Sequence, residues 1–258
     1  MEKFEGKWLP ESNDYKSACL RLSRNLNNFK RDLAYSIFVG NDLRDVQTAQ
    51  SFYNYILINY SYLLENDNIK RFLVNDRIGN PNTYNFNGVN ISPGTLRFMK
   101  VLGDILSIDK NIENIIEIGS GYGGQALVIK SFLEDVKYSV VDIPESLALS
   151  KSYLSGNGCD VTFIDTDNVV VDNKYDLVIS DYCLSELDLV GVKFYVDNII
   201  ANCKYGYFTV NSNDELLNML VTQLNNVFEQ VIINKEFPKT SYHDNHLIIC
   251  KNNKTLND

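Results

Sequence analysis

From about residue 113 onward, short apolar runs alternate along the chain with longer segments in which hydrophobic and polar residues are mixed. Short apolar runs there predict β-strands, because strands are short and rich in Val, Ile and aromatic residues. These runs cover residues 114–118, 138–141, 161–164, 176–180, 205–210, 231–237 and 246–251. Segments with helical periodicity lie between them, at 123–133, 145–154, 190–202 and 214–225.

This alternation predicts an α/β fold with a parallel sheet that is covered by helices on both faces. The last two apolar runs are separated only by Pro238–Asn245, which is too short for a crossover helix. These two strands are therefore expected to pair antiparallel. The expected architecture is a Rossmann-like sheet of parallel strands that ends in an antiparallel hairpin.

The first 92 residues have a different pattern and are expected to form a mainly helical N-terminal cap and linker, followed by an α/β domain over 93–258. Apolar residues at near-helical spacing predict a helix over 15–38, and Asp42 is the expected N-cap of a second helix over 43–64. Residues 77–94 contain several glycines and prolines, which predicts a loop-rich connector. Ser92 and Pro93 then open a helix over 93–106.

Charge and cysteine usage narrow the function classes. The net charge of −9 argues against a nucleic-acid surface, because phosphate binding needs a basic face. Five scattered cysteines without a CxxC pair indicate reduced thiols rather than disulfides or zinc ligands, and no metal centre is expected. The N-terminus lacks an apolar core, and no run of about 18 apolar residues exists to span a membrane. We therefore expect a cytoplasmic protein.

The strongest chemical signal is a glycine-rich turn directly after the first predicted strand of the sheet. Gly119, Gly121 and Gly124 satisfy the GxGxxG pattern of a nucleotide-binding βαβ unit. A NAD-dependent oxidoreductase is one interpretation of this pattern. Two features argue against it: the acidic Glu117 inside the strand, and the additional glycine at position 123.

The run from Glu117 to Gly123 resembles motif I of class I S-adenosylmethionine-dependent methyltransferases, whose sheet also ends in an antiparallel hairpin. The resemblance covers residues 93–251 and implies S-adenosyl-L-methionine as the cofactor. A narrower resemblance is to a family of bacterial sugar O-methyltransferases encoded in polysaccharide gene clusters. It rests on Gly79-Asn80-Pro81, Ser92-Pro93 with Leu96-Arg97, and Ser185-Glu186-Leu187.

The resemblance implies a set of cofactor-binding residues. The main chain around Glu117, Gly119, Ser120, Gly121 and Gly123 would approach the methionine portion of the cofactor, because glycines present no Cβ.

The remaining contacts implied by the resemblance concern the ribose and the adenine. Asp142, with Ile143 beside it, would accept hydrogen bonds from the ribose hydroxyls, although Asp142 could instead only cap the next helix. Asp165 is the candidate near the adenine, with Thr166 or Asp167 as alternatives.

Residues after the later strands are expected to meet the acceptor. Asp181 and Tyr182 should line the pocket of the cofactor and the acceptor, although Tyr182 could simply pack. Arg97 is a candidate for binding a phosphate of an activated sugar, with a surface charge as the alternative interpretation, and Asn211 is a further candidate contact.

A sugar hydroxyl needs a general base during methyl transfer. The two histidines, His243 and His246, lie in or beside the loop that is expected at the carboxyl edge of the parallel strands, where ligands bind. His243 is the first candidate for the base and His246 the second. Asp181 or Glu186 could replace them, either as the base or as a ligand to a divalent cation.

The sequence thus predicts an S-adenosylmethionine-dependent O-methyltransferase. Its expected substrate is a sugar or a nucleotide-sugar, such as a GDP-heptose, for capsule or lipopolysaccharide biosynthesis. The alternatives are a phosphate-linked or other small-molecule acceptor, a NAD-dependent oxidoreductase, or a non-catalytic subunit. The helical N-terminal third is expected to cover the acceptor side of the pocket or to form a homodimer interface.

Overall fold

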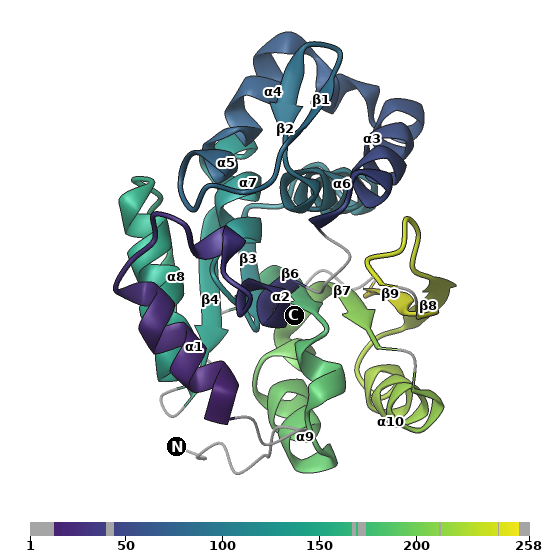
Figure 1. Ribbon diagram of the computed structural model, residues 1–258. Coiled ribbons are helices and arrows are strands. Elements are labelled where there is room, and N and C mark those ends of the chain that lie inside the picture. Colours follow the sequence, from purple (N-terminus) through teal and green to yellow (C-terminus); the bar gives the residue numbers. More distant parts are fainter. Residues whose placement is uncertain are drawn as a thin grey trace.

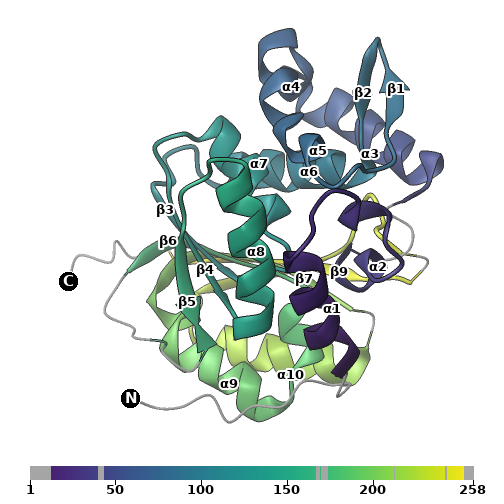
Figure 2. The same cartoon turned by 60° about the vertical axis from the view of Figure 1, so that its left-hand side comes forward.

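The computed structural model describes residues 13–39, 44–166, 169, 174–211, 213–241 and 243–252. Its centre is a sheet built from β3 (Asn114–Ile118), β4 (Lys137–Asp142), β5 (Thr162–Asp165), β6 (Tyr175–Asp181), β7 (Cys203–Val210), β8 (Gln230–Lys235) and β9 (His246–Lys251). The seven strands have the order β5-β4-β3-β6-β7-β9-β8 (Figure 1; β5 is labelled in Figure 2). The first five are parallel, and β9 is antiparallel to both of its neighbours. The predicted Rossmann-like sheet with a terminal hairpin is therefore confirmed.

Helices cover both faces of this sheet. One face carries α6 (Pro93–Ile108), α7 (Gly124–Phe132) and α8 (Pro144–Gly156), and the other carries α9 (Leu189–Asn198) and α10 (Asp214–Asn225). Because side chains alternate along a strand, neighbouring residues of β3 enter opposite layers: Ile115 belongs to the first core and Ile116 to the second. The predicted helix over 190–202 ends earlier, at Asn198, and its last residues form the 3-10 turn Ile200–Asn202.

The N-terminal part consists of short elements rather than two long helices. These are α1 (Asn13–Ser23), η1 (Phe29–Arg31), α2 (Tyr35–Val39), α3 (Val46–Asn59), η3 (Ser61–Leu64), α4 (Asn66–Phe72) and α5 (Val74–Arg77). The prediction of one helix over 15–38 is wrong. The chain leaves the helix near Asn25, whose side chain accepts a hydrogen bond from the Asn27 amide at 3.1 Å. Asparagine side chains that bind the local backbone in this way compete with helix formation.

Two further boundaries differ from the prediction. Asp42 lies outside the described residues, and α3 begins at Val46 with Asp45 as its N-cap, which accepts from the Thr48 amide at 2.7 Å. The predicted connector contains a hairpin of β1 (Tyr84–Phe86) and β2 (Val89–Ile91). Its turn is Asn87-Gly88 with φ of 50° and 86°, the combination that a tight two-residue hairpin favours.

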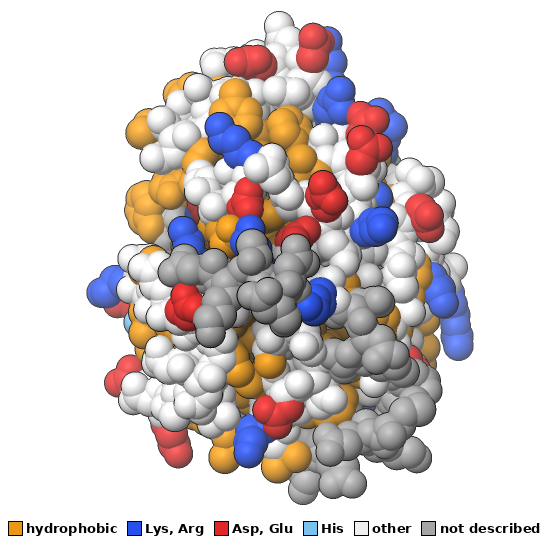
Figure 3. All heavy atoms as spheres, turned by 180° about the vertical axis from the view of Figure 1, so that it is seen from behind, with side chains coloured by type: hydrophobic (Ala, Val, Ile, Leu, Met, Phe, Trp, Pro, Cys, Tyr) orange, Lys and Arg blue, Asp and Glu red, His pale blue; other side chains and the backbone are white. Residues whose placement is uncertain are grey.

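These N-terminal elements pack on the sheet domain in two places. The α3 helix packs against α6, and α4 and α5 pack against α7, whereas α1 lies along α8 (Figure 2). On the face of the molecule opposite to the one seen in Figure 1, acidic and basic side chains are interspersed (Figure 3). No helix in the described part of the chain is long and apolar enough to cross a membrane.

Lys30 is a buried cation at the junction between η1 and the sheet domain. Its Nζ donates to the backbone carbonyl of Asn75 and to the Tyr153 hydroxyl at 3.0 Å, and it lies over the rings of Tyr122 and Tyr153. Burial lowers the pKa of this amine to about 7. The N-terminal segment is thus attached through an amine that exchanges its proton near neutral pH.

This attachment predicts a pH-dependent difference in stability. Between about pH 7 and pH 10.5 the unfolded chain keeps the Lys30 proton that the folded protein has lost, so folding is favoured as the pH rises. The free energy of unfolding of the wild type should rise relative to that of Lys30→Met by up to about 1.4 kcal/mol per pH unit. Urea denaturation at pH 7 and pH 8.5 measures this, with the exposed Lys70→Met as the control. Equal pH dependence in wild type and Lys30→Met would contradict it.

Candidate functional site

A cavity of about 310 Å³ opens at the carboxyl ends of β3, β6 and β7. This edge is where ligands bind in open parallel sheets, and the volume lies near the lower end for small-molecule sites. Five parts of the chain supply the wall. These are the N-terminal part (Tyr15 and 36–39), the turn after β3 (Gly119 and Gly121), the end of β6 and the turn after it (Asp181, Tyr182, Cys183 and Glu186), the loop after β7 (Asn211) and the loop between β8 and β9 (Thr240, Ser241, His243 and Asn245).

The glycine turn after β3 adopts a backbone that other residues rarely take. Gly119, Gly121 and Gly123 have φ of +82°, +54° and +88°. A Cβ on Gly119 would lie 2.4 Å from Cβ of Cys183, and one on Gly123 would lie 2.9 Å from Leu154. At Gly121, by contrast, a Cβ would meet no atom within 4 Å. Gly121 therefore presents bare main chain to the cavity.

Asp142 holds this turn from the end of β4. Its Oδ2 accepts from the Gly121 amide at 3.2 Å, from Oγ of Ser146 at 2.6 Å and from Oγ of Ser120 at 3.4 Å, and its Oδ1 accepts from the Ile143 amide at 2.8 Å. The side chain is buried, and burial raises its pKa to about 6. Asp142 lies next to the cavity without lining it, and it both caps the turn and contacts the start of α8.

Glu117 is buried inside the sheet rather than exposed to the cavity. It accepts hydrogen bonds from the Tyr138 hydroxyl at 2.9 Å and from Nε2 of Gln125 at 3.1 Å. Burial raises its pKa to about 8. Through Gln125, Glu117 thus connects the first turn of α7 to the sheet.

The predicted adenine-side residues lie at the same edge of the sheet. Asp165 is in register with Asp142 at the end of the neighbouring strand, and the next residue, Thr166, is buried. Neither residue lines the cavity, and the same is true of Ile143. Asp167 lies outside the described residues.

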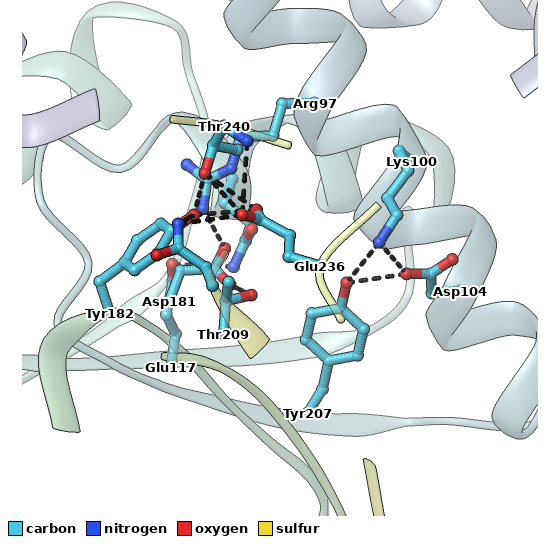
Figure 4. A network of polar contacts seen from close by, with 12 residues as sticks. Arg97, Lys100, Asp104, Glu117, Asp181, Tyr182, Tyr207, Thr209, Glu236 and Thr240 are labelled. Atoms are coloured by element: carbon cyan, nitrogen blue, oxygen red, sulfur yellow. Dashed lines mark hydrogen bonds and ion pairs between the residues drawn. The ribbon is translucent and has the colours of Figure 1, made fainter. Parts of the chain in front are cut away.

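Asp181 is a cavity-lining carboxylate that is paired from behind (Figure 4). Its Oδ2 lies 2.9 Å from Nη2 of Arg97, and its Oδ1 accepts from Oγ1 of Thr209 at 2.6 Å. The Arg97 guanidinium is buried and lies over the Tyr182 ring. The structure therefore does not bring Arg97, the predicted phosphate contact, to the cavity wall.

Tyr182 joins the two loops of the acceptor side. It has a left-handed backbone with φ of 67°, and its hydroxyl donates to Oε1 of Glu236 at 2.8 Å. The Glu236 carboxylate also accepts from Oγ1 of Thr240 (Figure 4). It accepts a further hydrogen bond from Nδ2 of Asn245. The sequence did not identify Glu236, Thr240 or Asn245 as site residues, although it predicted that the loop with Thr240 and Asn245 lies at the active-site edge.

The four predicted candidates for a base differ in position. His243 lines the cavity and is exposed, whereas His246 does not line it, and its buried Nδ1 has no hydrogen-bond partner among the described residues. Glu186, at the end of the 3-10 turn Cys183–Glu186, lines the cavity. Burial, with the charge of Asp142, raises the pKa of Glu186 to about 7. The fourth candidate, Asp181, is already engaged as an ion pair.

Asn211, a further candidate contact, lies directly after β7 in the cavity wall. Its main-chain amide and its Nδ2 donate to Oγ of Ser185 at 3.1 and 3.2 Å. Within the described residues, no group of three or more His, Cys, Asp or Glu side chains is placed to hold a metal ion.

The N-terminal part supplies one wall of the cavity, through Tyr15 and residues 36–39. The sequence predicted that the N-terminal third covers the pocket or forms a dimer interface, but it singled out none of these residues. Helical spacing predicts only which side chains are buried, and it is the packing of α1 on α8 that brings Tyr15 to the carboxyl edge of the sheet.

Several solved structures resemble this fold at low sequence identity. The crystal structure of EvdMO1 aligns with a TM-score of 0.47 and 13% identity over 66% of this chain and 44% of that chain, so the match spans less than half of EvdMO1. The methyltransferase domain of bacterial CtHen1-C aligns with a TM-score of 0.47 and 14% identity over 60% of this chain and 97% of that chain.

A third similar structure is the precorrin-6y C5,15-methyltransferase from Geobacter metallireducens. It aligns with a TM-score of 0.44 and 16% identity over 59% of this chain and 87% of that chain. The sequence itself matches no protein-family profile and no curated protein.

Proposed function

We propose that the protein is an S-adenosylmethionine-dependent methyltransferase that binds the methyl donor and its acceptor together in the cavity. The observation that carries the proposal is the bare main chain of Gly121 beside the start of α7. Gly123 precedes that helix and has no side chain to cap it, so no side-chain cap occupies the first amides of α7. A carboxylate such as that of the donor's methionine portion suits this position.

The charges around the cavity also suit the donor. Glu186 and Asp181 lie in the wall, and Asp142 lies beneath the glycine turn. Carboxylates near a sulfonium cation are favourable in a partly desolvated site. We retain Asp142 and Ile143 as the residues closest to the ribose, and Asp165 and Thr166 as those closest to the adenine.

A NAD-dependent oxidoreductase is less well supported. Dinucleotides bind across two mononucleotide-binding halves, each built from parallel strands and crossover helices. In this protein the sheet beyond β7 continues as the antiparallel strands β9 and β8. The second half therefore contains the parallel strands β6 and β7, but a hairpin replaces its third parallel strand.

The acceptor we propose is a hydroxyl group of a sugar. The acceptor side of the wall offers amide and hydroxyl groups from Asn211, Thr240, Ser241 and Asn245, which can hydrogen-bond a polyol. No Lys or Arg among the described residues lines the cavity. The wall therefore supports the sugar hydroxyl more directly than a phosphate of a nucleotide-sugar such as a GDP-heptose.

Methyl transfer breaks the carbon–sulfur bond of the donor and forms a carbon–oxygen bond, while the hydroxyl proton passes to a base. Alignment of the two reactants supplies much of the acceleration. We assign the base to Glu186, because it lies in the cavity wall and burial raises the pKa of its carboxyl group to about 7. His243 is the alternative base, and Asp181 and Tyr182 are proposed to orient the acceptor.

Substitution of Gly121 tests the donor site. Gly121→Ala should raise the dissociation constant of S-adenosylhomocysteine at least tenfold in calorimetry, because its methyl group enters the cavity. Gly158→Ala is the matched control, since Gly158 also has a positive φ, +67°, and open space in front of it. Both variants carry similar backbone strain, so a difference in their affinities reports the methyl group that Gly121→Ala places in the cavity. Equal affinities in the two variants would reject the site, and no binding to the wild type at millimolar ligand would reject the function.

Glu186→Gln tests the base. Turnover is measured on a panel of sugars and nucleotide-sugars by detecting the mass of the methylated product. The turnover of the wild type should rise with pH through about 7, because only the carboxylate form of Glu186 accepts the proton. Glu186→Gln should lower turnover by about 100-fold or more and leave S-adenosylhomocysteine affinity within a few-fold. If Glu186→Gln keeps its turnover while His243→Ala loses it, the base is His243.

A further inference from the structure

The N-terminal helix α1 reaches the cavity through one aromatic side chain. Tyr15 lines the cavity together with Phe38 of α2, and their ring centroids lie 5.1 Å apart. In Figure 2, α1 lies beside α8, the helix that follows Asp142. Two rings from two N-terminal elements thus form one part of the cavity wall, on the side of the strand that ends at Asp142.

The Tyr15 hydroxyl is directed to a buried serine. It donates to Oγ of Ser146 at 3.3 Å, and Ser146 is fully buried in the first turn of α8. Oγ of Ser146 lies 2.6 Å from Oδ2 of Asp142. A hydroxyl has one proton and two lone pairs, so the short contact with the carboxylate takes the Ser146 proton and a lone pair remains for Tyr15.

The chain of hydrogen bonds continues to the glycine turn. The same Oδ2 of Asp142 accepts from the Gly121 amide at 3.2 Å. Tyr15, Ser146, Asp142 and Gly121 therefore form one series that runs from the N-terminal helix to the bare main chain in the cavity. Because Ser146 and Gly121 donate to the same carboxylate oxygen, a shift of Ser146 after loss of the Tyr15 hydrogen bond moves the acceptor of the Gly121 amide.

We propose that Tyr15 is a positioning residue for the methyl donor, a role that rests on the proposed function. Its ring, with that of Phe38, covers the adenosyl portion of the donor, and its hydroxyl fixes the Asp142 carboxylate and the glycine turn through Ser146. Residues 13–39 accordingly belong to the donor site. This differs from the expectation that the N-terminal third covers the acceptor side.

The hydroxyl and the ring can be tested separately by calorimetry with S-adenosylhomocysteine. Tyr15→Phe removes one hydrogen bond and should raise the dissociation constant about three- to tenfold. Tyr15→Ala also removes the ring and should raise it further, and it should weaken the binding of adenosine alone by a comparable factor. Tyr60→Phe is the matched control, because the Tyr60 hydroxyl also donates a hydrogen bond to another side chain, Oδ1 of Asp104 at 2.7 Å, outside the cavity wall. Its affinity should stay within twofold of the wild type.

A double-mutant cycle tests the connection through Ser146. Ser146→Ala should weaken binding, and adding Tyr15→Phe to it should cause little further loss, because both changes interrupt the same series. Thermal unfolding without ligand identifies any variant that fails to fold, and Tyr15→Phe keeps the ring that packs. If the wild type binds S-adenosylhomocysteine and both Tyr15→Phe and Tyr15→Ala bind it with the same affinity, the role of Tyr15 is overturned and the proposed function stands. Fully additive losses in the cycle would have the same consequence. Absence of binding to the wild type would overturn the proposed function instead.

Discussion

The site depends on one hydrogen bond between neighbouring strands, from the Gly121 amide to the buried carboxylate of Asp142. It joins the turn after β3 to the end of β4, and β3 and β4 are neighbours in the parallel part of the sheet. The glycines hold the turn in a left-handed backbone, and the carboxylate holds the turn in place. The open main chain at Gly121 is the product of these two constraints.

Buried charge supports the acceptor side of the same cavity. The α6 helix is buried over most of its length, and it carries Arg97 and Lys100 toward the sheet. Arg97 pairs with Asp181, and Lys100 pairs with Asp104, which accepts in turn from the Tyr207 hydroxyl (Figure 4). Pairing lowers the cost of burying each charge. Asp181 can therefore lie in the cavity wall as a carboxylate whose position is fixed from behind.

Local patterns predicted the sheet well because each parallel strand is an apolar run and each crossover is an amphipathic helix. The closing hairpin followed from the length of the 238–245 loop, and the glycine turn from its spacing. The N-terminal elements were harder to predict, because Asn25 interrupts a helical pattern and Asn87-Gly88 turns a short hairpin inside the connector. The roles of Tyr15 and Glu236 arise from contacts between residues 131 and 54 positions apart, which no local pattern contains.

The most direct test of the account is a crystal structure of the protein grown with S-adenosylhomocysteine. The account predicts the ligand in the described cavity, with its sulfur over Gly121, its carboxylate at the start of α7 and its ribose on the Asp142 side. A ligand bound elsewhere, or an empty cavity at saturating ligand concentration, would contradict it.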